Sequence, residues 1–340
     1  MRKGIAVLAA LLTGLSLSSA AVMAQEEAYK VGIVKFVDHA SLNQIEESVK
    51  AELDALGQEN GRTYDYSAYV YNGNADGSQL QQIAAELISQ KVDVIIAIAT
   101  PAVQIMQAAC EEAGIPIVFS AVTDPVGSNL VKSMEEPGGN LTGTSDALNT
   151  NTVMDLIFSA DPDADYIGLL YSNSEDASKL AISEAKAYLD EKGISYIEKT
   201  GTTIDEVNAA ADALIAEGVD AVFTPTDNTI MNAELAIFEK LMEAGIPHYA
   251  GADSFALNGA FLGFGVNYED LGKETADVAA NILSGADPAV TPVKTFDNGI
   301  ATINVQTAEA IGFDLDSIKE AFAPYCSAII ETTTAREFGE

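Results

Sequence analysis

The stretch that decides the fold reads Phe119-Ser-Ala-Val-Thr-Asp-Pro-Val-Gly127 and then Pro137-Gly-Gly-Asn-Leu-Thr-Gly-Thr-Ser145. Its apolar run at 115–119 leads directly into a polar turn at 120–125, and the later Pro-Gly-Gly-Asn turn leads into a second short apolar run. Turns at the carboxyl ends of strands are where open α/β sheets hold ligands. The stretch therefore predicts an α/β protein with a binding site beside these turns.

Around this stretch, short β-rich runs alternate with longer runs of helical periodicity. The predicted strands are 30–36, 64–71, 92–97, 115–119 and 141–145, with predicted helices at 42–56, 77–90 and 102–113. The alternation returns with predicted strands at 166–171, 195–199, 221–225, 248–250 and 260–264 and helices at 176–191, 204–217 and 228–244. Repeated βαβ units imply parallel sheets covered by helices on both faces.

The two halves of the chain also resemble each other in sequence. The run Glu112-Ala-Gly-Ile-Pro116 returns as Glu243-Ala-Gly-Ile-Pro247, in each case between a predicted helix and a predicted strand. A chain of this length is expected to form two domains. The predicted fold class is therefore α/β, with two Rossmann-like lobes on parallel sheets.

Residues 1–24 are predicted to be a cleaved signal peptide. Met1-Arg2-Lys3 is positive, an apolar run follows, and Val22-Met23-Ala24 offers small residues for cleavage. The apolar run is short for a membrane span, which leaves an uncleaved N-terminal anchor as the weaker alternative. Because no Cys stands near the cleavage site, a lipid anchor is not expected. The mature protein is predicted to be periplasmic or otherwise extracytoplasmic, with free secretion as the lesser option.

The chain is strongly acidic. Its formal charge is −34, and removal of the signal peptide takes away Arg2 and Lys3 but no acidic residue, which gives −36. Such a surface repels phosphate backbones, so nucleic acid is excluded as a partner. The charge also favours a zwitterionic or cationic ligand over a polyanion.

The sequence offers no catalytic or metal-binding set. Cys110 and Cys326 have no metal or redox spacing, although one disulfide between them stays open, and His39 and His248 stand alone. The motifs G-x-S-x-G, Walker A and H-E-x-x-H are absent. We therefore expect a binding protein rather than an enzyme, without cofactor or metal.

The deciding stretch resembles a signature of ABC transporter substrate-binding proteins of the tryptophan/tyrosine type, in which a TDPV turn is followed by PGGNxTG. Gly265-Val-Asn-Tyr-Glu-Asp-Leu-Gly272 is similar to the family's GVDYxxLG, and the run 303–312 is similar to its INxxTAxxLG. Glu135-Glu136 and Asn267 depart from the family pattern. The resemblance implies the type I periplasmic-binding fold, with a ligand cleft between two lobes.

In that fold the chain crosses between the lobes three times, by analogy near 145, at 265–268 and between 293 and 301. The implied division is lobe one at 29–144 with 268–292, lobe two at 145–267 with 293–322, and a C-terminal tail at 323–340 that is loosely held.

The candidate ligand-binding residues stand at or just after the ends of the predicted strands, where helix N-termini offer free N–H groups. They are His39, Asn74, Thr100, Pro101, Ser120, Thr123, Asp124, Ser145, Tyr171, Ser174, Glu175, Thr226, Asp227 and Asp253. For most of the Ser, Thr, Asp and Asn residues, a plain helix cap or turn is the competing interpretation. Pro101 suits a first helical turn, which predicts Thr100 as the cap.

The resemblance implies a receptor that binds a small ligand, an aromatic amino acid above all, and delivers it to an ABC permease. We expect the protein to be a monomer. We expect Thr100 and Ser120 to bind the ligand carboxylate, Asp227 or Asp253 its ammonium, and Tyr171 its ring, unless Tyr171 is a core residue. Two alternatives stay open: a sensor that presents its ligand to a receptor, and a binder of a sugar or nucleoside.

Overall fold

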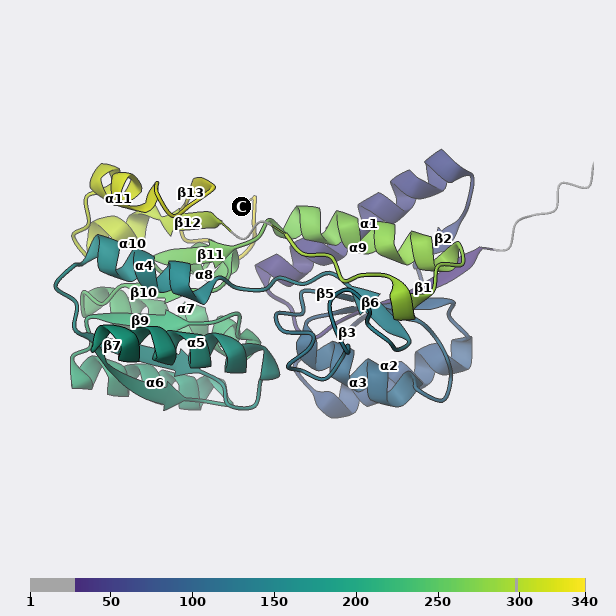
Figure 1. The fold of residues 1–340 in the computed structure, drawn as a ribbon, viewed down its shortest axis with the longest axis horizontal. Coiled ribbons are helices and arrows are strands. Elements are labelled where there is room, and N and C mark those ends of the chain that lie inside the picture. Colours follow the sequence, from purple (N-terminus) through teal and green to yellow (C-terminus); the bar gives the residue numbers. More distant parts are fainter. Residues whose placement is uncertain (1–27, 297–298, 340) are drawn as a thin grey trace, which may run out of the picture.

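The computed structural model describes residues 28–296 and 299–339. Within them the chain forms two α/β lobes that lie side by side, each built on its own sheet (Figure 1). The prediction of two lobes with parallel sheets is confirmed, apart from one antiparallel pair in the second lobe. The predicted signal peptide lies outside the described residues.

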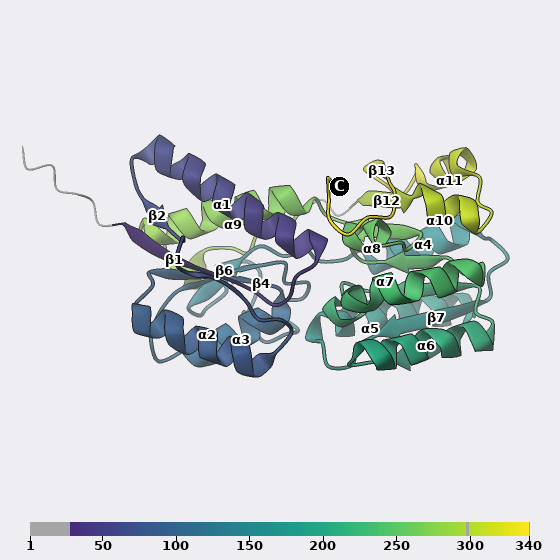
Figure 2. The same ribbon diagram turned by 180° about the vertical axis from the view of Figure 1, so that it is seen from behind.

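The first lobe contains a parallel sheet in the order β2-β1-β4-β5-β6, with β3 paired to β1. Its strands are β1 (Tyr29–Lys35), β2 (Tyr64–Asp65), β3 (Val70–Asn72), β4 (Val94–Ile98), β5 (Ile117–Ser120) and β6 (Leu141–Gly143). Every residue of β4 is buried and apolar, as is typical of a strand covered on both faces. The covering helices are α1 (Ala40–Asn60) with α9 (Tyr268–Leu283), and α2 (Gly77–Gln90) with α3 (Thr100–Cys110) (Figure 1 and Figure 2).

The second lobe contains a sheet in the order β13-β12-β11-β10-β9-β7-β8. Its strands are β7 (Tyr166–Tyr171), β8 (Ser195–Thr200), β9 (Ala221–Thr224), β10 (His248–Ala250), β11 (Leu262–Gly265), β12 (Ile300–Asn304) and β13 (Ala328–Thr332). Its helices are α4 (Thr150–Ala160), α5 (Asp176–Lys192), α6 (Ile204–Glu217), α7 (Asn228–Glu243), α8 (Asp253–Leu257), α10 (Val305–Ala310) and α11 (Leu315–Phe322). β11 leads out to the first lobe and β12 returns from it, so these two strands are antiparallel.

Two local features differ from the sequence expectation. The run 64–71, predicted as one strand, forms the two short strands β2 and β3, because Asp65 accepts hydrogen bonds from the N–H and hydroxyl of Ser67 and makes a turn. Thr100 is not the cap of α3: it is the first helical residue, and the cap is Ala99, whose backbone has φ 77° and ψ 144°. The chain leaves β4 through this unusual conformation and enters the helix one residue earlier than predicted.

Three segments connect the lobes. The chain passes from β6 to α4, from β11 to α9, and from the 3₁₀ turn η1 (Pro288–Val290) to β12. The first and third segments pair with each other, since Thr144 bridges Lys294 and the Ser145 N–H donates to the Lys294 carbonyl at 2.8 Å. Helix α9, which follows the second segment, packs against α1 beside the first sheet.

The Gly-rich part of the deciding stretch is explained by close packing of the backbone. A Cβ atom on Gly143 would lie 2.0 Å from the carbonyl oxygen of Phe119 on the neighbouring strand, so only glycine fits there. The preceding turn is fixed by Asp124, whose Oδ1 accepts the N–H of Gly127 at 2.8 Å. These motif residues therefore shape the lobe rather than present side chains to a ligand.

The C-terminal residues differ from the expected loose tail. Residues 328–332 form strand β13, which pairs with β12 in parallel and extends the second sheet. Beyond it, the Ala335 N–H donates to the carbonyl of Leu257, and Asn258 donates to the carbonyl of Ala335. Backbone pairing of this kind holds a terminus in place. The amino-acid composition of the segment does not predict this pairing.

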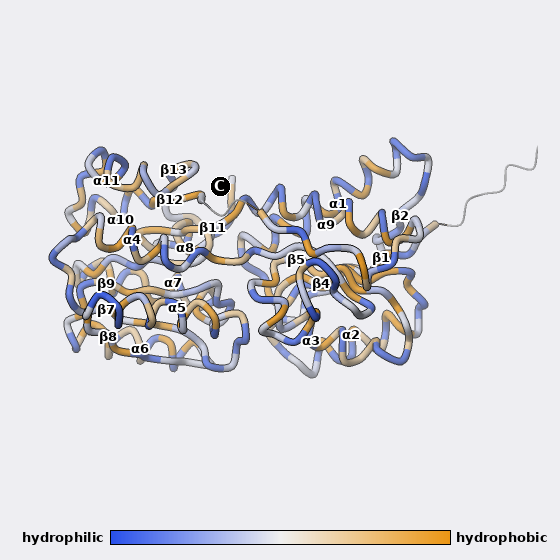
Figure 3. Tube along the Cα trace, in the orientation of Figure 1, coloured by the Kyte–Doolittle hydropathy of each residue, from blue (hydrophilic) through white to orange (hydrophobic). Residues whose placement is uncertain are grey.

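Apolar side chains fill both lobes between sheet and helices. Hydrophobic stretches run along the strands inside each lobe, and hydrophilic stretches lie on outer turns (Figure 3). Cys110 is buried in the first lobe, Cys326 lies beside the core of the second, and both are free thiols. The disulfide that the sequence left open is therefore not formed.

Candidate ligand-binding cleft between the lobes

A cavity lies between the two lobes, at the carboxyl ends of strands from both sheets. The first lobe lines it with His39, Ser41, Leu42, Ala99, Thr100, Ala121 and Thr123. The connecting segments and the second lobe contribute Asp146, Ala177, Thr226, Asp227, Asn228, Met231, Ala252, Ser254, Phe255 and Tyr268. The space between these residues that a water-sized molecule can reach is only about 30 Å³, so the lining side chains nearly fill the cavity in this arrangement of the lobes.

The lobes contact each other directly around the cavity. Thr123 and Thr226 share a hydroxyl hydrogen bond of 2.8 Å, and Nε2 of His39 lies 3.2 Å from Oδ1 of Asn228. Two further bonds cross the cleft: the Ser41 hydroxyl donates to Asp253 at 2.9 Å, and the Gln104 amide donates to Asp176 at 2.7 Å. These contacts require a closed arrangement of the lobes.

Two helices of the first lobe begin at the cavity without a side-chain cap. The cap residue of α1 is His39 and that of α3 is Ala99, and neither side chain bonds the first turn of its helix. The Oγ1 of Thr100 and the Nδ1 of His39 are buried without a hydrogen-bond partner. Uncapped helix N-termini carry positive partial charge, and buried polar atoms need partners, so this wall is suited to an anionic group such as a carboxylate.

Helix α7 of the second lobe begins differently, because its N–H groups are already satisfied. Asp227 accepts the N–H of Ile230 at 3.0 Å, and Glu175 accepts the N–H groups of Asn228 and Thr229 at 3.2 Å and 2.7 Å. Asp227 also accepts the N–H of Ser172 at 2.6 Å. The N-terminus of α7 is therefore occupied by carboxylates of its own lobe.

The charge of the cavity is acidic. Its lining includes the carboxyl groups of Asp146 and Asp227 and no Lys or Arg. Burial raises the pKa of Asp146, while burial and the nearby Glu175 carboxylate raise the pKa of Asp227. Burial lowers the pKa of His39 to about 4, so this imidazole is neutral at neutral pH. Because no group of fixed positive charge lines the cavity, a cationic group of a ligand would favour the ionised form of these carboxyl groups.

The backbone is strained at two residues of the cavity wall. Ala99, after β4, has φ 77°, and Ala121, after β5, has φ 53°; both are in the region that favours glycine. Strain of this kind persists where the surrounding structure imposes it and is concentrated at functional sites. Both residues stand at strand ends in the first lobe and face the same cavity.

The structure brings together part of the set of residues predicted from the sequence. Among the candidates, those that line the cavity are His39, Thr100, Thr123, Thr226 and Asp227. Pro101, Ser174 and Glu175 instead line a neighbouring hollow between the lobes, which shares Asn228 with the cavity. Asp253 does not line the cavity; it lies beside it, between the lining residues Ala252 and Ser254, and binds Ser41.

The other candidates do not line the cavity, because their side chains are engaged elsewhere. Ser120 lies in a buried hydroxyl cluster, 2.9 Å from Thr275 of α9. The Tyr171 hydroxyl donates to Glu198 on the neighbouring strand at 2.8 Å.

Three further candidates have local roles. Ser145 accepts the N–H of Ala147 at 3.2 Å, and Asn74 is exposed and contacts Gln79. Asp124 fixes its own turn, as described above. The interpretation of such residues as turn and cap formers is therefore the better one here.

Sequence reasoning missed several lining residues, among them Ser41, Asp146 and Tyr268. Asp146 and Tyr268 belong to the segments that connect the lobes. The analogy led us to expect crossings between the lobes near 145 and at 265–268. These expected positions are the signal that could have pointed to both residues. Because only strand ends were searched, residues on the connections were passed over.

No helix in 28–296 or 299–339 is both long and apolar enough to cross a membrane. In the same ranges, no group of three or more His, Cys, Asp and Glu residues is placed to hold a metal ion.

Comparison with known proteins identifies relatives over most of the chain. The sequence profile of the family described as "ABC transporter substrate binding protein" matches residues 30–320. The "Tyrosine-binding protein" of Clostridioides difficile (strain R20291) is 34% identical over 281 residues, which cover 83% of this chain and 80% of that protein.

Two solved structures are similar as well. One is an ABC domain from Streptococcus pneumoniae in complex with L-Trp, with 30% identity and a TM-score of 0.81; the match covers 89% of this chain and 100% of that one. The other is the ligand-free, open structure of a substrate-binding protein with adhesive properties from Clostridium difficile, also 30% identical, with a TM-score of 0.66 and coverage of 91% and 100%. The identity is the same and the coverage similar for the two structures, and the TM-score is higher with the Trp complex than with the open, ligand-free structure.

The family consists of solute-binding proteins of transporters rather than enzymes, and it implies a small-molecule ligand and a permease in the membrane. With a profile that spans most of the chain and a fold of two lobes around a cleft, the protein belongs to the ABC transporter substrate-binding protein family.

Proposed function

We propose that this protein binds an aromatic amino acid, namely tryptophan, phenylalanine or tyrosine, between its closing lobes and delivers it to an ABC permease. The observation that carries this proposal is the composition of the cavity, which has an uncapped, unpartnered wall on one side and carboxylates without fixed cations on the other. These two features are complementary to the two charges of a free amino acid. The names of the tyrosine-binding and Trp-bound relatives support an aromatic side chain.

The ligand carboxylate is assigned to the first lobe. Thr100, buried with an unpartnered Oγ1, and the first turn of α1 at Ser41 supply donors there. Ser120, the other residue expected to bind the carboxylate, is left out of this proposal because its hydroxyl is bonded to Thr275 and does not line the cavity.

The ligand ring is assigned to apolar side chains that line the cavity from both lobes. Leu42, Met231 and Phe255 are nearly fully buried there, and the ring of Tyr268 lies in the same lining. Aromatic rings gain most from such surroundings, through apolar contact and edge-to-face packing. Tyr171 is not part of this wall, since its hydroxyl is bonded to Glu198.

A thermal-shift screen of the purified mature protein tests the ligand class. A ligand that binds only the native state raises the free energy of unfolding by about 2.7 kcal/mol at a concentration of 100 times its Kd. We expect a clear rise in melting temperature with L-tryptophan, L-tyrosine or L-phenylalanine, and none with sugars or nucleosides. A shift with a sugar or nucleoside alone would overturn the proposal.

The cellular site and the oligomeric state belong to the same proposal. We infer an exported, monomeric protein that acts outside the cytoplasm after removal of residues 1–24. N-terminal sequencing of the protein recovered from the extracytoplasmic fraction should begin at Gln25, and light scattering should give the mass of one chain. A protein that keeps Met1, or a stable dimer, would contradict this part.

A further inference from the structure

Asp146 occupies a special place, in the segment that connects β6 of the first lobe to α4 of the second. It is only 6% exposed and lines the cavity. Its Oδ2 accepts the hydroxyl of Tyr268 at 3.2 Å, and Tyr268 begins α9, at the end of another connecting segment. The carboxyl group therefore lies where two connections between the lobes meet the ligand cavity.

The oxygens of Asp146 bind donors from the first lobe and from the start of α9, whereas those of Asp227 bind donors of the second lobe alone. Each oxygen of Asp146 accepts one side-chain hydroxyl, from Thr123 at 3.0 Å and from Tyr268 at 3.2 Å. Asp227 accepts three donors: the N–H groups of Ile230 and Ser172 and, at 2.7 Å, the hydroxyl of Ser178. The carboxyl group of Asp146 also lies within reach of its own backbone N–H. Since an ionised carboxylate has about four acceptor sites, at least one stays free for a donor of the ligand.

Asp146 also lacks a compensating charge. Within 28–296 and 299–339 it takes part in no described ion pair, and the cavity lining contains no Lys or Arg. Burying an unpaired carboxylate is costly, so such a group needs a cation or has to take up a proton. A ligand that brings its own positive charge meets this need.

We infer that Asp146 is the residue that receives the ammonium group of the ligand and thereby selects amino acids over their deaminated analogues. This inference rests on the proposed function and replaces Asp227 and Asp253 as the assigned partner of the ammonium. A buried carboxylate in the cavity that has a free acceptor site and no ion-pair partner suits an ammonium group, which brings both the donors and the charge.

The same contact links recognition of the amine to the closed arrangement. The Thr123 hydroxyl has one proton, which it donates in a hydrogen bond to ionised Asp146. In the hydrogen bond with Thr226 of the other lobe, Thr123 is therefore the acceptor and the Thr226 hydroxyl is the donor. An ammonium group at Asp146 keeps the carboxylate ionised and so maintains this chain of hydrogen bonds between the lobes. A deaminated analogue leaves Asp146 without a cation and is expected to close the lobes poorly.

The test compares L-tyrosine with 3-(4-hydroxyphenyl)propionate, which lacks only the amino group, by calorimetry on the full mature protein. L-Tryptophan with 3-(indol-3-yl)propionate and L-phenylalanine with 3-phenylpropionate serve in the same way if tyrosine is not bound. We expect wild type to bind the amino acid at least about 30-fold more tightly than the analogue, and Asp146→Asn to lose most of that difference. The affinity of Asp146→Asn for the analogue should stay the same or rise, which a merely structural role of Asp146 would not produce.

Asp253→Asn is the matched comparison, since Asp253 lies beside the cavity and the same change removes its charge. We expect Asp253→Asn to keep most of the preference for the amino acid. If Asp146→Asn keeps that preference, the inference is wrong although the proposed function stands. If wild type binds none of the three amino acids, the proposed function fails, and the inference falls with it.

Folding of Asp146→Asn is checked by thermal unfolding without ligand. Because the substitution removes an unpaired buried charge, the melting temperature should be equal to that of wild type or higher. Should the variant not fold, Asp146→Glu takes its place, since it keeps the charge on a longer side chain. Asp146→Glu should keep the preference for the amino acid but bind it more weakly, and an unchanged affinity would count against the inference.

Discussion

The Oγ1 atoms of Thr123 and Thr226 lie 2.8 Å apart and join the turn after β5 in one lobe to the turn after β9 in the other. Thr226→Val removes this hydrogen bond and keeps the shape of the side chain. A hydrogen bond of this kind contributes about 1 kcal/mol, so we expect ligand affinity to fall about fivefold. Calorimetry with L-tryptophan, L-tyrosine and L-phenylalanine measures the change for whichever amino acid binds.

Thr229→Val is the control for this experiment. The Thr229 hydroxyl, near the start of α7, donates to Glu175 at 2.7 Å within the second lobe. Loss of this hydroxyl affects the second lobe but not the hydrogen bond between Thr123 and Thr226. We expect Thr229→Val to lower the free energy of unfolding and to leave ligand affinity essentially unchanged. Equal losses of affinity in both variants would show that the contact between Thr123 and Thr226 has no special role in closure.

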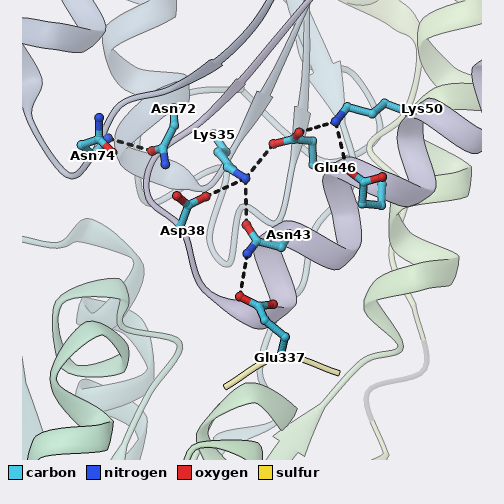
Figure 4. A network of polar contacts seen from close by, with 9 residues as sticks. Lys35, Asp38, Asn43, Glu46, Lys50, Asn72, Asn74 and Glu337 are labelled. Atoms are coloured by element: carbon cyan, nitrogen blue, oxygen red, sulfur yellow. Dashed lines mark hydrogen bonds and ion pairs between the residues drawn. The ribbon is translucent and has the colours of Figure 1, made fainter. Parts of the chain in front are cut away.

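The C-terminal segment supplies a further contact between the lobes. After β13 the chain turns toward the first lobe, and Oε1 of Glu337 accepts the amide of Asn43 on α1 at 3.0 Å; Asn43 also accepts a bond from Lys35 (Figure 4). Removal of residues 334–340 breaks this contact and should shift the protein toward more open forms. Small-angle scattering should show a larger radius of gyration for the truncated protein without ligand.

A shorter truncation, which removes only residues 338–340, is the control because it leaves Glu337 and its bond to Asn43 in place. We expect its radius of gyration to equal that of the full chain. If removal of 334–340 leaves the radius of gyration unchanged as well, the C-terminal segment does not hold the lobes together.

The elements that the sequence predicted best are those with local signals. Helix α2 was predicted with its observed bounds, because its apolar residues recur at helical spacing after Asp76, whose side chain caps the first turn. The sites at strand ends were partly predictable for a related reason: Thr123 and Thr226 follow parallel strands, whose carboxyl ends lie at one edge of each sheet.

The remaining features depend on contacts between residues far apart in sequence. Tyr171 stands at a strand end like the lining residues, but the register of β7 and β8 places Glu198 within reach of its hydroxyl. Asp146 and Tyr268 meet only because two connecting segments run side by side between the lobes. No periodicity or motif in the sequence encodes that meeting, so it became visible only in the folded chain.

Asp227 should make the stability of the protein depend on pH. Burial and the nearby Glu175 raise its pKa above the ordinary value of 3.8. The native state therefore keeps a proton that the unfolded state releases from about pH 4 upward, so this contribution to stability is complete at low pH and is lost as the pH rises through the raised pKa. Asp227→Asn cannot ionise and should lose less stability than wild type between pH 4 and pH 8, by more than about 1 kcal/mol.

Urea unfolding at pH 4, 6 and 8, without ligand, measures this difference. Asn is as good a helix cap as Asp, so the variant should keep the start of α7. Asp163→Asn, at an exposed position, is the control and should follow the wild-type profile. Parallel pH profiles for wild type and Asp227→Asn would show that burial of this carboxyl group does not limit stability.

The strained backbone at Ala99 gives the last prediction. With φ 77° and ψ 144°, this residue is in a conformation that glycine adopts freely, and such strain costs about 1–3 kcal/mol. Glycine loses about 0.5–1 kcal/mol more conformational entropy on folding, so Ala99→Gly should raise the free energy of unfolding by about 0.5–2 kcal/mol. Ala97→Gly, two residues earlier in the regular strand β4, should instead lower it by about 1 kcal/mol or more, through lost burial and entropy. Urea unfolding measures the free energy of unfolding of both variants. A loss of stability in both would mean that the backbone at Ala99 stores no strain that glycine can relieve.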